Sequence, residues 1–120
     1  MWLHPFLPQQ ALFKAYDIRG DITLFSDDFL WALGQGFARL FAQHGGGRVA
    51  IGYDVRKFSP RIAAFIAYHC HVQGLSIDWL GQVTTPMMAH AASCQDGHGV
   101  MVTASHSPRH VHGVKWLCAH

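Results

Sequence analysis

Residues 99–108 read Gly-Val-Met-Val-Thr-Ala-Ser-His-Ser-Pro, and this stretch indicates both the fold and the chemistry of the chain. Its first half is a short apolar run typical of a buried strand, and its second half is a polar loop with a proline at its end. Such a strand would hold the hydroxyl of Ser105 at a rigid strand end, with His106 beside it. Lys115, which follows Ser105 by ten residues, is predicted to start a second strand that folds back beside the serine. A hydroxyl with an amine nearby suits covalent or phosphoryl-transfer chemistry.

Strands and helices are predicted to alternate along the rest of the chain. Apolar runs predict strands at residues 12–18, 49–53 and 75–79, in addition to the strand that begins at Gly99. Strands separated by helices need crossover connections, which are typical of parallel or mixed sheets. We therefore expect one α/β domain over residues 1–120, with a mixed, largely parallel sheet of about four strands covered by helices.

The helices are predicted from the residues that begin and end them. A serine or threonine before a helix caps its free N–H groups, proline is tolerated in the first turn, and glycine commonly ends a helix. By these signals, helices are expected from the cap Ser26 to the glycines at 45–47, from Ser59-Pro60 to Gly74, and from Thr85-Pro86 to near Ser93.

Composition argues against several classes of function. The net charge is only +2, and the nine lysines and arginines form no run, so no nucleic-acid partner is expected. The three cysteines are an odd number without a Cys-x-x-Cys pair, which favours a reducing, cytoplasmic location over a disulfide framework. No segment approaches the roughly 18 uncharged apolar residues of a membrane span, so no membrane partner is expected.

Polar residues follow three of the predicted strands, at 17–20, 54–56 and 105–107. In open α/β sheets the loops at the carboxyl ends of strands collect the chemistry, so these segments are expected to converge. A planar guanidinium matches phosphate oxygens, which favours a phosphate-facing role for Arg19. Arg56 is interpreted instead as a structural residue that holds its loop against a neighbouring loop.

Two other patterns carry less weight. The histidines and cysteine near the carboxyl end lack the short paired spacings of a zinc site, apart from His110-x-His112. These residues are His106, His110, His112, Cys118 and His120. The sequence Gly34-Gln35-Gly36 lies inside a predicted helix and lacks a third glycine, so it does not indicate a dinucleotide site.

At these residues the chain resembles the N-terminal domain of the α-D-phosphohexomutases, the phosphomannomutase/phosphoglucomutase family. Four segments match the family in order and together span roughly residues 12–116. They are Phe-Lys-Ala-Tyr-Asp-Ile-Arg-Gly at 13–20, Gly-Tyr-Asp-Val-Arg at 52–56, Gly-Gln-Val-Thr-Thr-Pro at 81–86, and Thr-Ala-Ser-His-Ser-Pro at 103–108 with Gly-Val-Lys at 113–115.

The resemblance implies a role for five residues. Ser105 would carry the phosphoryl group that is given to a hexose phosphate and recovered from the hexose 1,6-bisphosphate, which also serves as activator. Lys115 would act as general acid and base, and His106 would assist beside the nucleophile. Tyr16 and Arg19 would line the site. The activity implied is the interconversion of hexose 1-phosphate and hexose 6-phosphate.

The resemblance also implies that parts of the machinery lie in other domains. In the family, a Mg²⁺ ion bridges the phosphoserine, Ser105 here, and aspartates of a second domain. Those aspartates, the sugar-specificity loop and the distal phosphate site are expected outside this chain, so the isolated chain is expected to be inactive. The family usually has asparagine where Ser107 stands, and commonly Tyr-Asn where Val111 and His112 stand. These departures keep open an alternative function as a truncated, non-catalytic binding or assembly module.

Overall fold

The computed structural model describes residues 13–104 and 107–119, with side chains described from Asp17 onward. These residues form a five-stranded sheet in the order β1-β5-β4-β2-β3. The strands are β1 (Phe13–Asp21), β2 (Arg48–Tyr53), β3 (Ser76–Gln82), β4 (His98–Val102) and β5 (Val111–Ala119). The α/β class is therefore confirmed, with five strands rather than four.

The sheet is mixed, as predicted. β2 runs parallel to both β3 and β4, whereas β5 runs antiparallel to both β4 and β1. Parallel pairings are thus two of the four between the described strands, fewer than expected. The difference arises because β1 and β5 add to the sheet as an antiparallel pair beyond β4.

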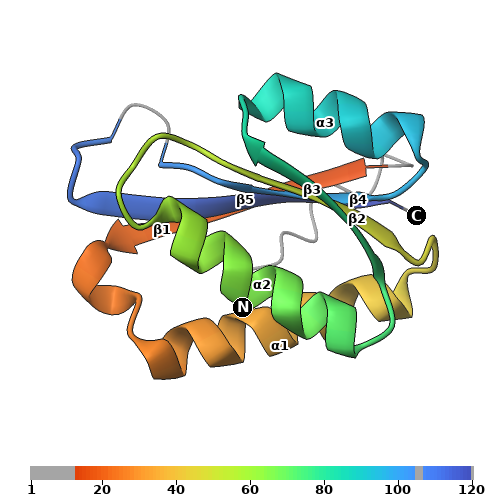
Figure 1. Cartoon of the computed structure of the whole chain (residues 1–120), viewed down its shortest axis with the longest axis horizontal. Helices are drawn as coiled ribbons and strands as arrows, with labels where there is room; N and C mark the ends of the chain where they lie inside the picture. The colour runs from red at the N-terminus through yellow and green to blue at the C-terminus, as the bar shows by residue number, and fades with distance from the viewer. Residues whose placement is uncertain (1–12, 105–106, 120) are drawn as a thin grey trace.

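Helices cover both faces of the sheet, so the domain has three layers (Figure 1). α1 (Asp27–Gln43) and α2 (Ser59–Val72) pack on one face, and α3 (Thr85–Cys94) packs on the other face against β4 and β2. A short 3-10 helix, η1 (Ile22–Leu24), connects β1 to α1.

The helix starts agree with the sequence signals at α1 and shift slightly at the other two helices. Ser26 caps α1, since its Oγ accepts a hydrogen bond from the N–H of Phe29 at 3.2 Å. Thr84, rather than Thr85, caps α3, because its Oγ1 accepts from the N–H of Met87 at 3.3 Å. Ser59 is the first residue of α2 and does not cap it; its hydroxyl instead donates to Oδ1 of Asp54 at 2.6 Å.

The main core lies between the sheet and the pair α1 and α2. Phe37 and Phe41 of α1 and Trp116 of β5 are fully buried there, and the rings of Phe37 and Trp116 meet edge to face at 4.9 Å. A smaller core under α3 contains Met88 and Met101. Val114, Trp116 and Cys118 of β5 belong to the main core, so the residues that alternate with them face the α3 side.

Gly34, the first residue of the sequence Gly34-Gln35-Gly36, allows α1 and α2 to approach closely. A Cβ atom at Gly34 would lie 2.4 Å from Cδ2 of His69 and 3.0 Å from the carbonyl oxygen of Phe65. His69 is buried there and packs edge to face on the ring of Trp31 at 4.3 Å. Its Nε2 has no hydrogen-bond partner among the described residues, and burial lowers the pKa of His69 below its usual 6.5.

This burial predicts a pH-dependent loss of stability. Because the pKa of His69 is lower in the folded state, the unfolded chain binds a proton more readily, and stability that is complete above pH 6.5 is lost as the pH falls through the folded pKa. One such group can change the free energy of unfolding by at most about 1.4 kcal/mol per pH unit.

We expect the melting temperature to fall between about pH 7.5 and about pH 5.5, and to fall less in the variant His69→Gln. His71→Gln, on the exposed side of the same helix, is the matched control and should leave the pH dependence unchanged. Equal pH dependence in the parent chain and in His69→Gln would contradict this account.

Among residues 13–104 and 107–119, no helix combines the length and apolar character needed to cross a lipid bilayer.

Candidate functional site

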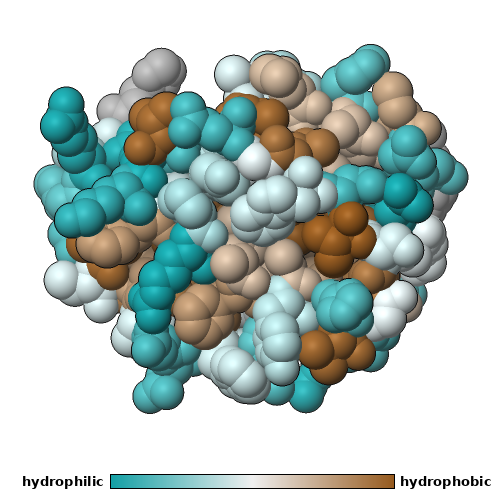
Figure 2. Space-filling view, in the orientation of Figure 1, coloured by the Kyte–Doolittle hydropathy of each residue, from teal (hydrophilic) through white to brown (hydrophobic). Residues whose placement is uncertain are grey.

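The candidate site lies at the edge of the sheet where the parallel strands β2 and β4 end. The β2–α2 loop, the segment after β4 and the end of β1 come together there, at the left of Figure 1. On the face shown in Figure 2, the side chains along this edge are largely hydrophilic. The expected convergence of segments 17–20, 54–56 and 105–107 is confirmed by hydrogen bonds that reach Ser107 from both Arg19 and Arg56.

Arg19 lies within β1, which continues to Asp21 and does not end at residue 18 as predicted. Its Nη1 donates to Oγ of Ser107 at 3.1 Å and to the carbonyl oxygen of Ala104 at 3.4 Å. Its Nη2 lies 3.8 Å from Oδ2 of Asp17, in an ion pair that is partly exposed. Arg19 therefore places a positive charge at both described ends of the segment that contains Ser105.

Lys115 lies in the middle of β5, because this strand begins at Val111 and not at Lys115 as predicted. The register places it opposite Met101 of β4 on one side and Asp17 of β1 on the other. Directly opposed residues point to the same face, so Lys115 shares the α3 side of the sheet with Asp17 and with Arg19, two residues further along β1.

Three of the predicted site residues lie wholly or partly outside the described residues. Ser105 and His106 lie outside the described residues, and so does the side chain of Tyr16. The described residues on either side of Ser105 and His106 make backbone hydrogen bonds. The N–H of Ser107 donates to the carbonyl oxygen of Ala104 at 3.1 Å, and the N–H of Thr103 donates to the carbonyl oxygen of Gly113 in β5 at 2.8 Å.

Arg56 connects the β2–α2 loop to residues 107–111. Its guanidinium donates to the carbonyl oxygens of Pro108 at 2.6 Å, Ser107 at 2.8 Å and Val111 at 3.2 Å. Its Nε also donates to Oδ2 of Asp54 at 3.1 Å. The interpretation of Arg56 as a residue that holds its loop against a neighbouring loop is therefore confirmed.

Asp54 is the acidic partner that anchors this arrangement. Burial raises the pKa of Asp54, but hydrogen bonds from the Ser59 hydroxyl, the Arg56 N–H and the Thr103 side chain outweigh burial and leave the pKa below its usual 3.8. The carboxylate therefore stays charged at neutral pH beside Arg56. The spacing Asp-x-Arg in the sequence indicated the local pair, but not the contacts with Ser59, Thr103 and residues 107–111.

The described residues do not supply a metal site. Outside positions 1–12, 105–106 and 120, no three His, Cys or Asp side chains are grouped closely enough to hold a metal ion. A Mg²⁺ ion requires several oxygen ligands in near-octahedral geometry. His110 and His112 do not form a pair either, because His110 is exposed near Asp21 whereas His112 is buried against Phe25 and Phe58.

Fold and geometry together define a three-layer α/β/α domain in which Arg19 of β1 and Lys115 of β5 share one face of the sheet, and Arg19 bonds to Ala104 and Ser107. The profile described as "Phosphoglucomutase/phosphomannomutase, alpha/beta/alpha domain I" matches residues 10–120. The chain therefore belongs to the phosphoglucomutase/phosphomannomutase family, and the resemblance drawn from its sequence motifs is confirmed.

Individual relatives agree with this membership. The chain is 38% identical over 108 residues to a phosphoglucomutase of Neisseria gonorrhoeae, covering 88% of this chain and 24% of the relative. It is 32% identical to a phosphomannomutase/phosphoglucomutase of Pseudomonas syringae, covering 96% of this chain and 25% of the relative. A solved structure of a phosphoglucomutase/phosphomannomutase family protein from Burkholderia thailandensis superposes with a TM-score of 0.72 and 30% identity, over 87% of this chain and 25% of that chain. The chain thus spans about a quarter of the length of these relatives.

The Arg56 contacts predict a local effect of mutation. The variant Arg56→Lys keeps the charge but cannot donate to three carbonyl groups and a carboxylate at once. We expect hydrogen exchange at the amides of Ser107 and Val111 to become at least about tenfold faster, because charged hydrogen bonds of this kind contribute about 1.5–3 kcal/mol each.

Arg48→Lys is the matched control, since Arg48 makes a two-point ion pair with Asp78 at the opposite end of β2. It should leave exchange at Ser107 and Val111 unchanged. Unchanged exchange at these two amides in Arg56→Lys would show that Arg56 does not hold the loop.

Proposed function

We propose that this chain is the phosphoserine-bearing first domain of a phosphohexomutase that interconverts hexose 1-phosphate and hexose 6-phosphate. Its membership of the phosphoglucomutase/phosphomannomutase family is the observation that carries the proposal. The position of Arg19 and Lys115 on one face of the sheet, with Arg19 bonded to both described ends of the Ser105 segment, supports it.

In the proposed reaction, Ser105 carries a phosphoryl group before substrate binds. A free hydroxyl of the hexose phosphate attacks that phosphorus, the bond to the Ser105 oxygen breaks, and a hexose bisphosphate forms. After the sugar reverses its orientation, the Ser105 oxygen attacks the other phosphoryl group and the phosphoserine is restored. The net change is the transfer of one phosphate between two positions of the sugar, so hexose 1,6-bisphosphate can also prime an unphosphorylated serine.

Lys115 is the proposed general acid and base of these steps. Its amine accepts the proton of the attacking sugar hydroxyl and returns it to the serine oxygen as that oxygen leaves. Arg19 stabilises the negative charge on the transferring phosphoryl oxygens, for which its planar guanidinium is suited. His106 and Tyr16 are proposed to position the phosphoserine and the substrate.

Other parts of the proposal concern the complete protein. The family resemblance implies a Mg²⁺ ion on the phosphoserine, but the described residues do not provide its other ligands, so no step here is assigned to the metal. The remaining domains would supply those ligands and select the sugar. Relatives carry the names phosphoglucomutase, phosphomannomutase/phosphoglucomutase and phosphoglucosamine mutase. A cytoplasmic location is part of the same proposal.

The first test concerns the site of phosphorylation. When the full-length parent enzyme is incubated with hexose 1,6-bisphosphate and Mg²⁺, we expect mass spectrometry to locate the phosphate on Ser105. The variant Ser105→Ala should lose the label and at least about a thousandfold in kcat, because a covalent step disappears. Ser107→Ala, two positions away, should keep the label. Phosphate on another residue, or full activity in Ser105→Ala, would reject the assignment.

The second test concerns proton transfer. Lys115→Arg keeps the positive charge, but a guanidinium does not give up its proton in proteins and so cannot act as a general base. We expect kcat to fall by about 10²–10⁴-fold with KM nearly unchanged, and the pH dependence assigned to the general base to disappear. A rise in KM with kcat unchanged would assign Lys115 to substrate binding instead.

A further inference from the structure

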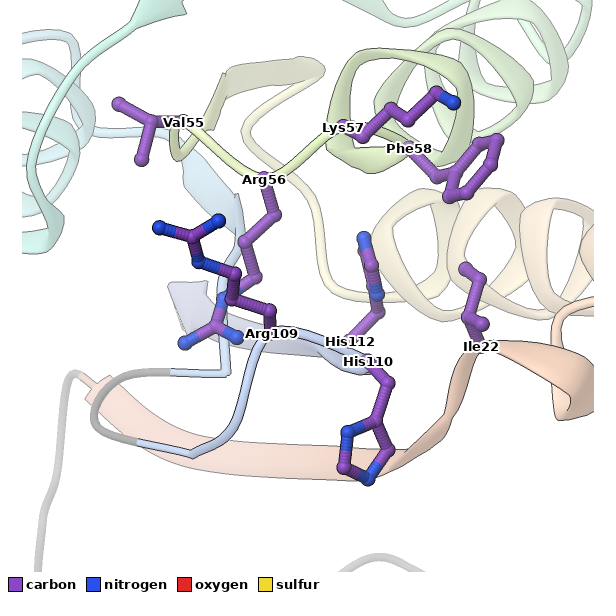
Figure 3. Close-up of a pocket in the computed structure, with 8 residues that line it drawn as sticks. All are labelled: Ile22, Val55, Arg56, Lys57, Phe58, Arg109, His110 and His112. Atoms are coloured by element: carbon purple, nitrogen blue, oxygen red, sulfur yellow. The ribbon is translucent and has the colours of Figure 1, made fainter.

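A pocket lies at the same edge of the sheet, next to His112, which faces the α1 and α2 side of β5 and so points away from the face of Lys115. It has a volume of about 660 Å³, within the range of about 300–1,000 Å³ that is usual for small-molecule sites. Its lining comes from η1, the β2–α2 loop, the segment before β5 and the start of β5 (Figure 3): Ile22, Val55, Arg56, Lys57, Phe58, Arg109, His110 and His112.

The lining contains a buried polar group without a partner. His112 is only 3% exposed, and neither of its ring nitrogens has a hydrogen-bond partner among the described residues. Figure 3 shows its ring between the two arginines on one side and Ile22 and Phe58 on the other. Leaving such a group unpaired costs about 1–3 kcal/mol. Both nitrogens are closed off from solvent, so a hydroxyl group in the pocket recovers part of that cost when the imidazole ring turns toward it.

His112 is also in the form that suits a hydroxyl group. Burial is the largest influence on its pKa and lowers it below 6.5, so the imidazole is neutral at physiological pH. A neutral imidazole has one N–H donor and one nitrogen acceptor, which together match the donor and acceptor capacity of a hydroxyl. The rings of Phe25 and Phe58 hold the imidazole in place at 6.5 Å and 5.9 Å.

Among the basic residues of the pocket, Arg109 is the one available to an anion. Arg56 is already bonded to Asp54 and to three carbonyl oxygens. His110 points away from His112 in Figure 3 and lies 3.8 Å from Asp21. Arg109 is exposed and has no hydrogen-bond or ion-pair partner within residues 17–104 and 107–119. Lys57, whose amine lies 5.3 Å from the Phe58 ring centre, adds a second positive charge at the rim.

Apolar side chains form the rest of the walls. Ile22, Val55 and Phe58 line the pocket, and Phe58 and Val55 remain 40% and 78% exposed. An aromatic ring and aliphatic groups fit the C–H face of a sugar ring. Three kinds of group thus lie together: a guanidinium for a phosphate, a neutral imidazole for a hydroxyl and an apolar wall for a ring.

We propose that this pocket is a second binding site for a sugar phosphate, with the phosphoryl group on Arg109, a sugar hydroxyl on His112 and the ring against Phe58. The site is distinct from the one around Ser105, since neither Arg19 nor Lys115 lines it and His112 faces the opposite side of the sheet from Lys115. It therefore does not depend on the proposed reaction.

The experiment is an NMR titration of the ¹⁵N-labelled chain with glucose 6-phosphate, with inorganic phosphate and glucose as separate arms. We expect saturable shifts at the amides of Lys57, Phe58, Arg109 and His112, and affinity at least tenfold higher for glucose 6-phosphate than for either fragment. Arg109→Gln should weaken this binding at least tenfold. His112→Asn, which introduces the amide common in the family, should weaken the glucose 6-phosphate arm more than the phosphate arm.

Arg39→Gln is the matched control, because it removes one exposed positive charge from α1, and it should leave binding unchanged. The titration is repeated in Ser105→Ala and in Arg19→Gln; persistence of the pocket shifts in both separates this site from the proposed reaction. Shifts confined to β1 and Lys115, equal losses in Arg109→Gln and Arg39→Gln, or equal affinity for inorganic phosphate and glucose 6-phosphate would each overturn the proposal. The spectrum of each variant shows whether it is folded.

Discussion

The insertion of β5 between β4 and β1 is the constraint on which the site depends. At Gly113 these strands approach so closely that a Cβ atom would lie 2.8 Å from the carbonyl oxygen of Ile18 and 2.9 Å from that of Thr103. Real Cβ atoms do not tolerate such contacts with backbone, so a side chain here would push the strands apart. The same register sets Lys115 opposite Asp17 and places Arg19 beside Ser107. The close approach of β5 to β1 and β4 thus determines the positions of three charged side chains, Asp17, Arg19 and Lys115.

A second constraint at this edge of the sheet is polar: the ion pair between Asp54 and Arg56. A guanidinium that is only 12% exposed would be costly to bury alone, and Asp54 together with three carbonyl oxygens satisfies its donors. Asp54 is satisfied in turn by Ser59, which explains why that serine does not cap α2. The β2–α2 loop and residues 107–111 therefore behave as one polar unit at the end of the sheet.

The polar groups on both faces of the sheet lie at the same edge, for a reason that is common to α/β folds. Parallel strands end their backbone pairing together, and the loops that follow carry groups not needed for the core. On the α3 face this edge presents Arg19 and Lys115. On the opposite face it presents Arg109 and the buried ring of His112. Arg56 stabilises the described part of the segment after β4 by bonding to the backbone carbonyl oxygens of Ser107 and Pro108.

The amino-acid sequence alone was enough to locate the elements whose signals are local. The apolar runs, the cap Ser26 and the glycines at 45–47 located β2, β4 and α1 closely, and the motif order identified the family. Three other features became known from the folded arrangement alone: β5 starts at Val111, Ser59 bonds to Asp54, and Arg56 reaches residues 107–111. Those outcomes depend on which groups distant in sequence meet across the sheet edge. A hydroxyl or guanidinium can bond locally or remotely with similar energy, so packing, and not the neighbouring residues, selects its partner.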